Sequence, residues 1–398
     1  MKLAIITERA NITLGGAERS VFELAARMAL LGVDVKILAA TGTMQSRRVK
    51  VLCSSSEKRI ALEDFKKALL KHFKENHYDI IHSMLPFDFA DVYQPRGGSY
   101  PEAAVRNAAS YNNTVLRIFK LLTSFANLRR TSLARAEKKL CKLVRRDGKE
   151  KGPVIAALSE YVGAQFKKYY GLPDERIYVC PNGIRLPASA QIPKTDKLRA
   201  QILAKLNIKQ ADEPVFFLFV AHNFRLKGLA NLIKALAVVN SRFTKRPACL
   251  IVVGKGRTLK YRRLAAGINV KNRIIFFGPA GSIHNLLSCA DVAVLPTYYD
   301  PSSRFILEAL AADRPVITTK YNGAADLFTA DRHGKIFDSP DDIDSLAEAM
   351  RYFCSTENLA AAKKAIQQDD IKSKVSIETH CKALLTLYET IIKNRAQK

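Results

Sequence analysis

The sequence predicts an α/β protein made of two parallel-sheet domains. Short apolar runs of strand length alternate with segments whose apolar residues recur at helical spacing, and this alternation occurs in two series along the chain. A proline-rich stretch of low periodicity separates the two series. A chain of 398 residues is also longer than one ordinary core supports, so length alone favours two domains.

The first series begins with the chain itself. It predicts a strand at 2–7, a glycine turn at Gly15 and Gly16, a helix at 17–32 and further strands at 33–40 and 78–84. The second series predicts strands at 214–221, 248–256, 273–279, 291–297 and 315–319, and helices at 228–240, 283–290 and 303–312. Strands that alternate with helices in this way favour parallel sheets covered on both faces.

These patterns give a domain plan. We expect a first Rossmann-like domain at 1–184, with a basic insert at about 105–150, then a linker at 185–197 and a second Rossmann-like domain at 198–372. The last segment, 373–398, contains an amphipathic helix that is expected to pack back on a domain, with the first domain as the candidate. Two such domains bind ligands at the carboxyl ends of their strands, so the loops after strands are the places to search.

The charge of the chain is unusual. Lys and Arg number 64 against 37 Asp and Glu, which gives a net charge of +27. A field of this size favours a polyanionic partner, such as nucleic acid, an anionic membrane surface or a phosphorylated substrate. The sequence has no apolar run long enough for a membrane-spanning helix and no pattern of a signal peptide. Its seven scattered cysteines are typical of reduced thiols in the cytoplasm.

Two loops after strands contain groups suited to an anionic ligand. Gly15 and Gly16 would let the backbone approach a phosphate or a sugar, although an ordinary tight turn explains a lone glycine pair equally well. Arg225 and Lys227 follow a strand and stand at the predicted start of the next helix, where cations oppose the helix dipole. This placement favours a bound anion, and two solvated surface cations are the alternative.

The third loop leads from the strand at 291–297 into a helix. Asp300 lies in the loop, Ser302 or Ser303 is predicted to cap the helix, and Glu308 lies inside the helix among apolar residues. Carboxylates accept hydrogen bonds from sugar and ribose hydroxyls, and loop N–H groups with serine hydroxyls hold phosphate oxygens. The alternative is a simple turn at Asp300 and an exposed Glu308, but a carboxylate in apolar surroundings usually has a specific partner.

Four segments in this order resemble the retaining GT-B glycosyltransferases of family 4, and among them the lipopolysaccharide-core glucosyltransferases. The matching segments are "GGAERSVFELA", "LSEYVGAQFKKYYGLPDERIYVCPNGI", "RLKG" and "DPSSRFILEALAADRPVITT". The resemblance covers nearly the whole chain. It implies a retaining, metal-independent hexosyltransferase without a cofactor, which moves glucose from UDP-glucose to a phosphorylated, membrane-associated glycolipid such as the lipopolysaccharide inner core. The enzyme is expected on the cytoplasmic face of the inner membrane.

The resemblance also implies roles for individual residues. Lys227 stands at the lysine that neutralises the donor diphosphate, with Arg225 as its helper, and Asp300 stands at the first acid of the motif, beside the transferred sugar. Further donor contacts are expected from Gly15, Gly16, His222, Ser302, Ser303, Arg304 and Glu308, of which Glu308 holds the ribose. Fixed cations and helix N-termini would stabilise the leaving diphosphate without a metal.

The sequence departs from the family pattern at four places. Asp300 replaces a glutamate, Ser303 a loop glycine and His222 an arginine, while Arg96 and two glycines stand where many relatives carry a histidine. These departures leave the identity of the donor and the contacts of the acceptor open. His82, at the end of a predicted strand, fits a buried structural histidine at least as well as a functional one.

Residues 111–146 hold ten Lys or Arg and one acid, Glu137, with apolar residues at roughly helical intervals. This pattern is typical of a basic amphipathic segment on an anionic bilayer, and a packed helical hairpin with a solvated basic face is the alternative. The residues expected to meet the acceptor or the membrane are Arg96, Arg129, Arg130, Lys138 and Lys139.

Three other functions compete with this interpretation. A nucleic-acid-binding protein would explain the charge, but the sequence shows none of the usual nucleic-acid-binding signatures, so no nucleic-acid partner is expected. A lectin-like or scaffolding relative without activity would keep the fold, although the acids and Lys227 argue against decay. A sibling enzyme with the same donor chemistry and another lipid-linked or capsular acceptor remains open.

Overall fold

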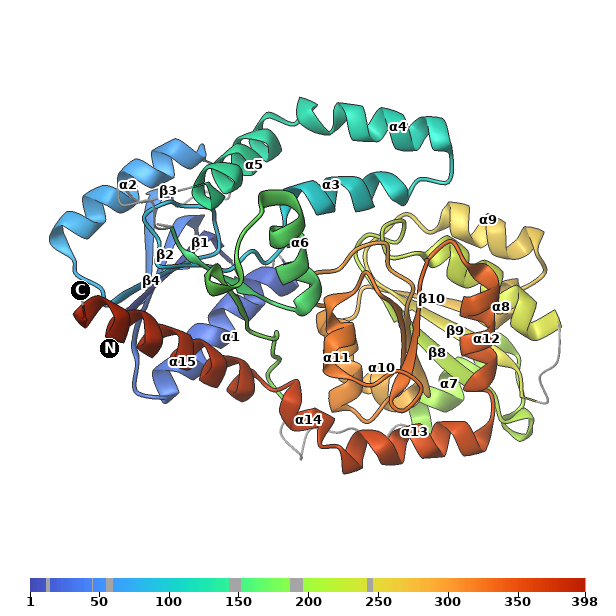
Figure 1. Cartoon of the computed structure of the whole chain (residues 1–398). Coiled ribbons are helices and arrows are strands. Elements are labelled where there is room, and N and C mark those ends of the chain that lie inside the picture. The colour runs from blue at the N-terminus through green and yellow to red at the C-terminus, as the bar shows by residue number, and fades with distance from the viewer. Residues whose placement is uncertain are drawn as a thin grey trace. The chain divides into compact units, whose positions relative to one another are not determined.

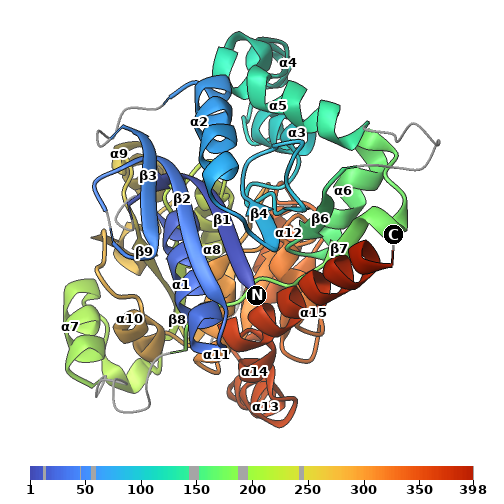
Figure 2. The same cartoon turned by 90° about the vertical axis from the view of Figure 1, so that its left-hand side faces the viewer.

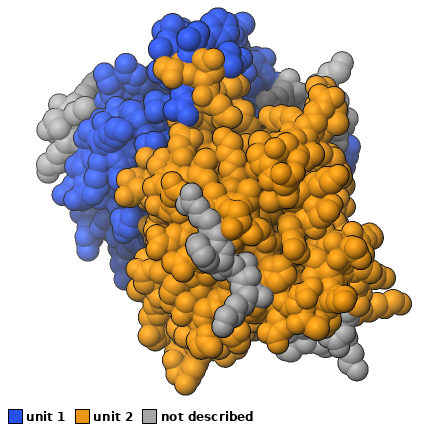
Figure 3. Space-filling model, turned by 90° about the vertical axis from the view of Figure 1, so that its right-hand side faces the viewer, with its two compact units in different colours: residues 1–108, 115–185, 377–398 blue, residues 109–114, 186–376 orange. Residues whose placement is uncertain are grey.

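The computed structural model describes residues 1–11, 15–44, 46–54, 60–142, 152–186, 196–241 and 246–397. The chain forms two compact units, which Figure 3 colours separately. Unit 1 contains Met1–Ala108, Val115–Arg185 and Ile377–Lys398, and unit 2 contains Ala109–Thr114 and Leu186–Ser376. Each unit has its own parallel sheet, which confirms the predicted fold class.

Among the described residues, unit 1 has a seven-stranded sheet in the order β3-β2-β1-β4-β5-β6-β7. The strands are β1 Lys2–Ala10, β2 Asp34–Gly42, β3 Val49–Ser54, β4 Ile80–Ser83, β5 Val92–Tyr93, β6 Val154–Ala157 and β7 Ile177–Val179 (Figure 1). In β1, Leu3 pairs with Val35 of β2 on one side and with Ile80 of β4 on the other. A central parallel strand is buried on both faces, which explains why β1 begins as a continuous apolar run.

Helices cover both faces of this sheet. One face packs against α1 (Gly16–Leu30) and α15 (Ile377–Ala396), and Figure 2 shows these two helices on the same side. The other face packs against α2 (Leu62–Glu75), α5 (Leu128–Cys141) and α6 (Glu160–Tyr170). Two further helices, α3 (Tyr100–Ala109) and α4 (Thr114–Leu122), precede α5 along the chain.

Among the described residues, unit 2 has a six-stranded parallel sheet in the order β10-β9-β8-β11-β12-β13. The strands are β8 Val215–Val220, β9 Ala248–Val253, β10 Ile274–Gly278, β11 Val292–Leu295, β12 Val316–Thr319 and β13 Gly334–Phe337. The helices are α7 Asp196–Leu206, α8 Leu229–Ser241, α9 Leu259–Gly267, α10 His284–Cys289, α11 Arg304–Ala311, α12 Ile343–Tyr352, α13 Thr356–Gln368 and α14 Ile371–Lys374. Of these, α8 packs against α12 and β9, while α11 packs against β11 and β12.

Two predicted segments lie partly outside the described residues. In the linker expected at 185–197, residues 187–195 are outside, and Asp196 and Lys197 are the first residues of α7. In the basic insert expected at about 105–150, residues 143–150 are outside, and the described part contains the end of α3 and the whole of α4 and α5. None of the described helices is both long enough and apolar enough to cross a bilayer.

The two described helices of the basic segment differ in how they are packed. Every side chain of α4 is exposed or half-buried, including Ile118 at 56% and Phe119 at 54% exposure. In contrast, α5 buries Leu133, Glu137 and Leu140 against the sheet. The packed-hairpin alternative therefore describes α5, whereas α4 keeps an apolar surface in contact with solvent.

Glu137 is the single acid of the basic segment, and it points into unit 1. Its carboxylate accepts hydrogen bonds from the Tyr93 hydroxyl at 2.9 Å, the Tyr170 hydroxyl at 2.6 Å and the Tyr100 N–H at 2.9 Å. Burial raises the pKa of Glu137 to about 7, although these three donors oppose the shift. Glu137 thus joins α5 to β5, α3 and α6.

This raised pKa predicts a pH dependence of stability that disappears in Glu137→Gln. Because the folded protein binds the proton more tightly than the unfolded chain, Glu137 destabilises the fold as pH rises from about 4.5 to about 7. We expect wild type to lose up to about 3 kcal/mol over this window relative to Glu137→Gln, measured by urea unfolding between pH 5 and 8. Parallel curves for the two proteins would contradict the assignment.

Candidate active site

The strand order of unit 2 contains one reversal of direction. The chain places β9 and β10 on one side of β8, then returns to place β11, β12 and β13 on the other. Ligands of open α/β sheets bind beyond the carboxyl ends of the strands at such a point. Lys227 lies in the loop after β8 and Asp300 in the loop after β11, so the reversal brings these two predicted residues together.

Lys227 and Asp300 form an ion pair between these loops. The Lys227 Nζ lies 2.7 Å from Asp300 Oδ2 and also donates to the carbonyl of Tyr299 at 2.8 Å. The two side chains are only 18% and 17% exposed. Because the pair is largely shielded from water, its electrostatic attraction is stronger than that of a surface pair, and the ammonium group is held in place.

The loop after β8 is organised by Asn223. The N–H of Leu226 donates to Asn223 Oδ1 at 3.2 Å, and the N–H of Lys227 donates to the Asn223 carbonyl at 3.0 Å. The Leu226 carbonyl in turn accepts from the N–H of Tyr298 at 2.9 Å, which joins this loop to the loop after β11. Sequence reasoning missed Asn223, although asparagine commonly bonds the backbone of turns.

Arg225 and Lys227 lie in the loop before the next helix, and α8 begins at Leu229, one residue after the predicted start at 228. Gly228 separates them from it with a left-handed φ of 78°. A Cβ at this position would lie 2.0 Å from the carbonyl oxygen of Pro296. Only glycine therefore allows the loop to approach the end of β11 this closely.

Asp300 also bonds the backbone on both sides of it. Its Oδ1 accepts from the N–H of Ser302 at 3.2 Å, its N–H donates to the Tyr321 carbonyl at 2.9 Å, and its carbonyl accepts from the N–H of Gly323 at 2.9 Å. The last two bonds reach the loop after β12. Asp300 is thus fixed by its own loop and by a neighbouring one.

The start of α11 is capped differently from the prediction. Ser303 occupies the N-cap position, but the bond there runs from its N–H to Asn322 Oδ1 at 3.1 Å instead of to a serine hydroxyl. Asn322 Oδ1 also accepts from the N–H of Ala324 at 3.2 Å. Ser302 and Ser303 are both buried in this loop. The Asn-Gly pair at 322–323 marks a turn in the sequence, but nothing in it indicates that Asn322 reaches α11.

Glu308 lies on the half-exposed side of α11, while Phe305, Ile306 and Leu307 are buried. The Arg304 guanidinium lies 3.8 Å from Glu308 Oε1, one helical turn away. Arg304 is therefore one partner of this carboxylate, at the long end of ion-pair distances. The two side chains are 15% and 18% exposed, so this pair is shielded from water to a similar degree as Lys227 and Asp300.

Arg225 lies over an aromatic ring of the same unit. Its guanidinium carbon is 3.8 Å from the ring centroid of Tyr111, and its Nη1 donates to the Ser110 hydroxyl. These residues border a cavity of about 380 Å³. Its other lining residues include Gly228, Asn231, Lys260, Tyr261 and Tyr298.

Two further observations concern this side of unit 2. Burial raises the pKa of Tyr261 to about 12, so its phenol is neutral at pH 7 and can donate a hydrogen bond. His222 is exposed at the beginning of the loop that contains Arg225.

Within the described parts of the chain, no group of three or more His, Cys, Asp or Glu side chains is arranged to hold a metal ion.

Gly15 and Gly16 belong to unit 1, where they begin α1 after β1. Gly15 is the N-cap residue, with an extended backbone, and its carbonyl accepts from the N–H of Arg19 at 3.1 Å. In the first turn Glu18 forms an ion pair with Arg9 at 2.6 Å. Residues 12–14 of the predicted glycine loop lie outside the described residues. The reversal of strand order in this sheet falls between β1 and β4, so the glycine loop lies at the equivalent point of unit 1.

Unit 1 has a cavity of about 360 Å³ at the carboxyl ends of β4 and β5. Arg96 borders it and donates from Nη1 to the Ser20 hydroxyl at 2.8 Å and to Asn182 Oδ1 at 3.4 Å. Arg129 borders it as well, forms an ion pair with Glu8 and donates to the Ile60 carbonyl at 2.8 Å. Arg129 is therefore held inside unit 1 instead of on a solvated basic face.

The other cations predicted to meet the acceptor or the membrane lie on α5. Arg130 is half-buried and borders the same cavity, while Lys138 and Lys139 project from α5 into solvent.

His82 is fully buried on β4 and bonds the Tyr388 hydroxyl, as the structural alternative expected. Burial lowers the pKa of His82 well below its ordinary value, helped by the nearby charge of Arg96.

Two family models divide the chain between them. Residues 14–186 match the model described as "Glycosyltransferase Family 4", and residues 202–369 match "Glycosyl transferases group 1". Together with two Rossmann-like units, these matches define the class: the chain is built from the two domains of a GT-B glycosyltransferase of group 1 and family 4.

Individual proteins and solved structures are also similar to this chain. The lipopolysaccharide glucosyltransferase WaaG of Escherichia coli K12 is 29% identical over 203 residues, which are 50% of this chain and 53% of that protein. The chain thus spans about half the length of this curated relative. The crystal structure of WaaG superposes over 98% of this chain and 99% of WaaG with a TM-score of 0.71 at 22% identity. Anabaena Alr3699/HepE in complex with UDP and glucose gives a TM-score of 0.64 at 17% identity over 98% and 99% of the two chains.

The close approach at Gly228 predicts a strong effect of Gly228→Ala. The new methyl group would meet the Pro296 carbonyl, and alanine tolerates a φ of 78° poorly, so we expect a loss of about 2 kcal/mol or more in urea unfolding. Gly267→Ala in α9 is the matched control, because a Cβ there meets nothing within 4 Å. Equal unfolding midpoints for the two variants would contradict this account of the loop.

Proposed function

We propose that this protein is a retaining glucosyltransferase that uses UDP-glucose and acts on a phosphorylated glycolipid at a membrane surface, such as the lipopolysaccharide inner core. The observation that carries the proposal is the Lys227–Asp300 pair at the strand-order reversal of unit 2. The likeness to WaaG supports the lipopolysaccharide acceptor, and the fold shared with a UDP- and glucose-bound protein supports the donor.

The proposed chemistry follows from the charge that develops on the leaving group. When the bond between sugar and diphosphate breaks, negative charge accumulates on the phosphate oxygens, and a cation already held in place stabilises it without reorganisation. Lys227 would bind the diphosphate either in place of Asp300 or together with it, with Arg225 close by along the loop. Asp300 would then contact the transferred sugar, and Glu308 would accept from the ribose hydroxyls.

The acceptor would attack on the same face from which the diphosphate leaves, which retains the anomeric configuration. No residue of the chain is assigned as a nucleophile. Fixed cations supply the charge stabilisation in this scheme, so we propose that transfer needs no metal ion.

Membrane association is part of the proposal. The exposed apolar residues of α4 stand next to cations of α4 and α5, the arrangement with which peripheral helices bind anionic bilayers. We propose that the protein acts at the cytoplasmic face of a membrane, where an anionic glycolipid would be presented. We propose no nucleic-acid partner.

The test is nucleotide release from a panel of nucleotide sugars, with and without a heptose-containing lipopolysaccharide-core acceptor, in the presence and absence of EDTA. We expect release from UDP-glucose only, stimulation by the acceptor and the same rate with EDTA. Release that requires a different lipid-linked acceptor would favour the sibling-enzyme alternative. A folded protein that releases no nucleotide from any donor would favour a binding role.

Removal of either charged donor contact should lower turnover without unfolding the protein. We expect Lys227→Ala to reduce kcat about 10²-fold or more, because it removes charge stabilisation of the leaving group. Glu308→Ala should reduce kcat/KM about 10- to 100-fold, as for the loss of a charged hydrogen bond. The surface variants Lys364→Ala and Glu348→Ala serve as controls. Wild-type rates in Lys227→Ala or Glu308→Ala would refute the assignment.

The membrane proposal predicts a loss of vesicle binding when α4 becomes polar. Ile118→Ser and Phe119→Ser should each weaken binding to phosphatidylglycerol vesicles about tenfold, since each removes a large apolar side chain from the interface. Leu259→Ser, which replaces a residue 59% exposed on α9 of unit 2, should leave binding unchanged. Equal sedimentation of all three variants with vesicles would make α4 a structural element only.

A further inference from the structure

Two cavities of unit 1 share the side chains of Tyr100 and Arg130. One is the polar cavity of about 360 Å³ at the strand ends, bordered by Glu8, Arg96 and Arg129. The other has a volume of about 250 Å³ and lies between α3, α4 and α5, which run beside one another in Figures 1 and 2. We call this second cavity the α3–α5 groove. Its lining is Tyr100, Pro101, Ala104, Val105, Leu121, Arg130, Thr131 and Ala134.

The α3–α5 groove is apolar apart from its end at Arg130. Ala104 of α3 and Ala134 of α5 are small, which leaves a space between the helices that larger side chains would fill. Val105 and Leu121 remain 38% and 41% exposed. Apolar surface of this kind, in a concave site, is characteristic of a place where an apolar ligand binds.

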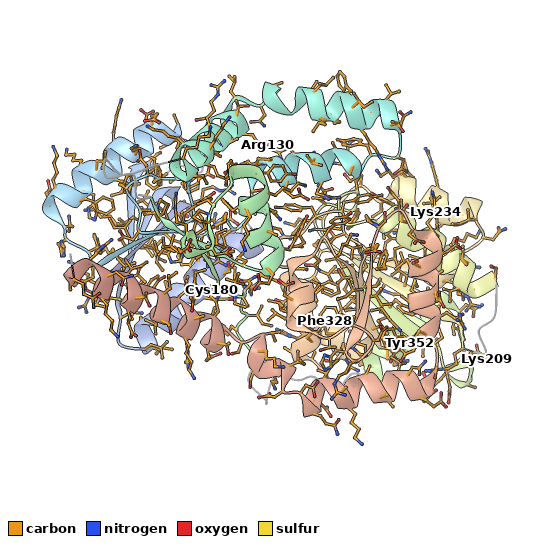
Figure 4. The ribbon with its side chains drawn as sticks, viewed as in Figure 1. Arg130, Cys180, Lys209, Lys234, Phe328 and Tyr352 are labelled. Carbon is orange, nitrogen blue, oxygen red and sulfur yellow. The ribbon has the colours of Figure 1, made fainter. Side chains whose placement is uncertain are left out.

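Arg129 and Arg130, at the junction of the two cavities, differ in whether they are paired with a carboxylate. Arg129 is already paired with Glu8 and bonded to the Ile60 carbonyl. Arg130, one residue further along α5, forms no ion pair with any carboxylate in the described part of the chain. Figure 4 labels Arg130 beside α5. A half-buried cation without a carboxylate partner, at the end of an apolar groove, complements a ligand with one anionic end and one apolar end.

We propose that the α3–α5 groove and the polar cavity form one amphiphile site, in which Arg130 binds the phosphate of a membrane lipid and the groove takes a segment of its acyl chain. The inference deepens the proposed function, on which it rests for the biological source of the lipid. It assigns the recognition of the lipid part of a phosphorylated glycolipid to residues outside the sugar-transfer machinery. The exposed face of α4 would lie at the bilayer, from which the chain enters the groove.

The test is calorimetric titration of the whole protein with alkyl phosphates of six to twelve carbons, each below its micelle-forming concentration. Inorganic phosphate and alkyl maltosides of equal chain length are the control ligands. We expect saturable binding that tightens about fourfold per added methylene until the groove is full, and at least tenfold weaker binding of both control ligands. Binding without dependence on chain length would overturn the proposal.

Substitutions separate the two ends of the site. Ala104→Phe fills the groove and should abolish the dependence of alkyl phosphate affinity on chain length. If Ala104→Phe unfolds, Ala134→Leu tests the same point with a smaller change of volume. Arg130→Gln should reduce alkyl phosphate binding to the level of the maltoside and leave maltoside binding unchanged. Val115→Ser, on α4 outside the groove lining, is the matched control. Unchanged alkyl phosphate binding in Ala104→Phe or Arg130→Gln would overturn the proposal.

A spectroscopic measurement locates the ligand independently. The chain contains no tryptophan, so Leu121→Trp introduces a single tryptophan into the groove, which is excited selectively at wavelengths that its 14 tyrosines absorb weakly. We expect its emission to shift to the blue with decyl phosphate and to stay constant with inorganic phosphate. An emission that decyl phosphate leaves unchanged would contradict the site.

Failure of this inference and failure of the proposed function are distinguishable. Nucleotide release from UDP-glucose with a delipidated acceptor is measured on the same preparations. Release without alkyl phosphate binding overturns the amphiphile site alone, whereas alkyl phosphate binding without release from any donor overturns the proposed transfer and retains the site.

Discussion

The molecule depends on one constraint of parallel β structure: consecutive parallel strands are joined by crossovers that run over a face of the sheet. All loops that follow strands therefore lie at one edge of the sheet. Where the strand order reverses, two neighbouring loops are separated and leave a crevice between them. In unit 2 this separation lies between β8 and β11, where Lys227 meets Asp300. In unit 1 it lies between β1 and β4, beside the cavity that contains Glu8 and Met84.

The charges at these edges are compensated in different ways. The Lys227 ammonium donates to a carboxylate and a carbonyl, and the Arg225 guanidinium lies over the face of Tyr111. The Glu137 carboxylate accepts from two phenols and a backbone N–H. A paired charge in a shielded place keeps its position, because an unpaired one would be costly to leave there. These charged groups are therefore held in fixed positions, although the net charge of +27 would otherwise favour dispersed, solvated cations.

The sequence predicted five of the six described strands of unit 2, because a strand buried on both faces is a continuous apolar run, as in Val215–Val220. It missed β13, Gly334–Phe337, whose burial is only partial. It also placed Asp300 in a loop and Glu308 in a helix. It predicted the start of α8 to within one residue, but it did not predict the left-handed backbone at Gly228 that separates Lys227 from the helix. The bonds between loops were also beyond it: Asn322 and Ser303 are 19 positions apart, and no periodicity marks the contact.

The packing of α15 has a consequence for the order in which the units are completed. Cys381, Leu384 and Tyr388 of this last helix are buried in the same core as α1, and Cys180, labelled in Figure 4, lies with its sulfur 3.4 Å from His380 Nδ1. Domains usually fold in the order in which the ribosome makes them. Here the unit that is synthesised first has an open apolar face until the final helix emerges, so its core closes only after the whole of unit 2 has been made.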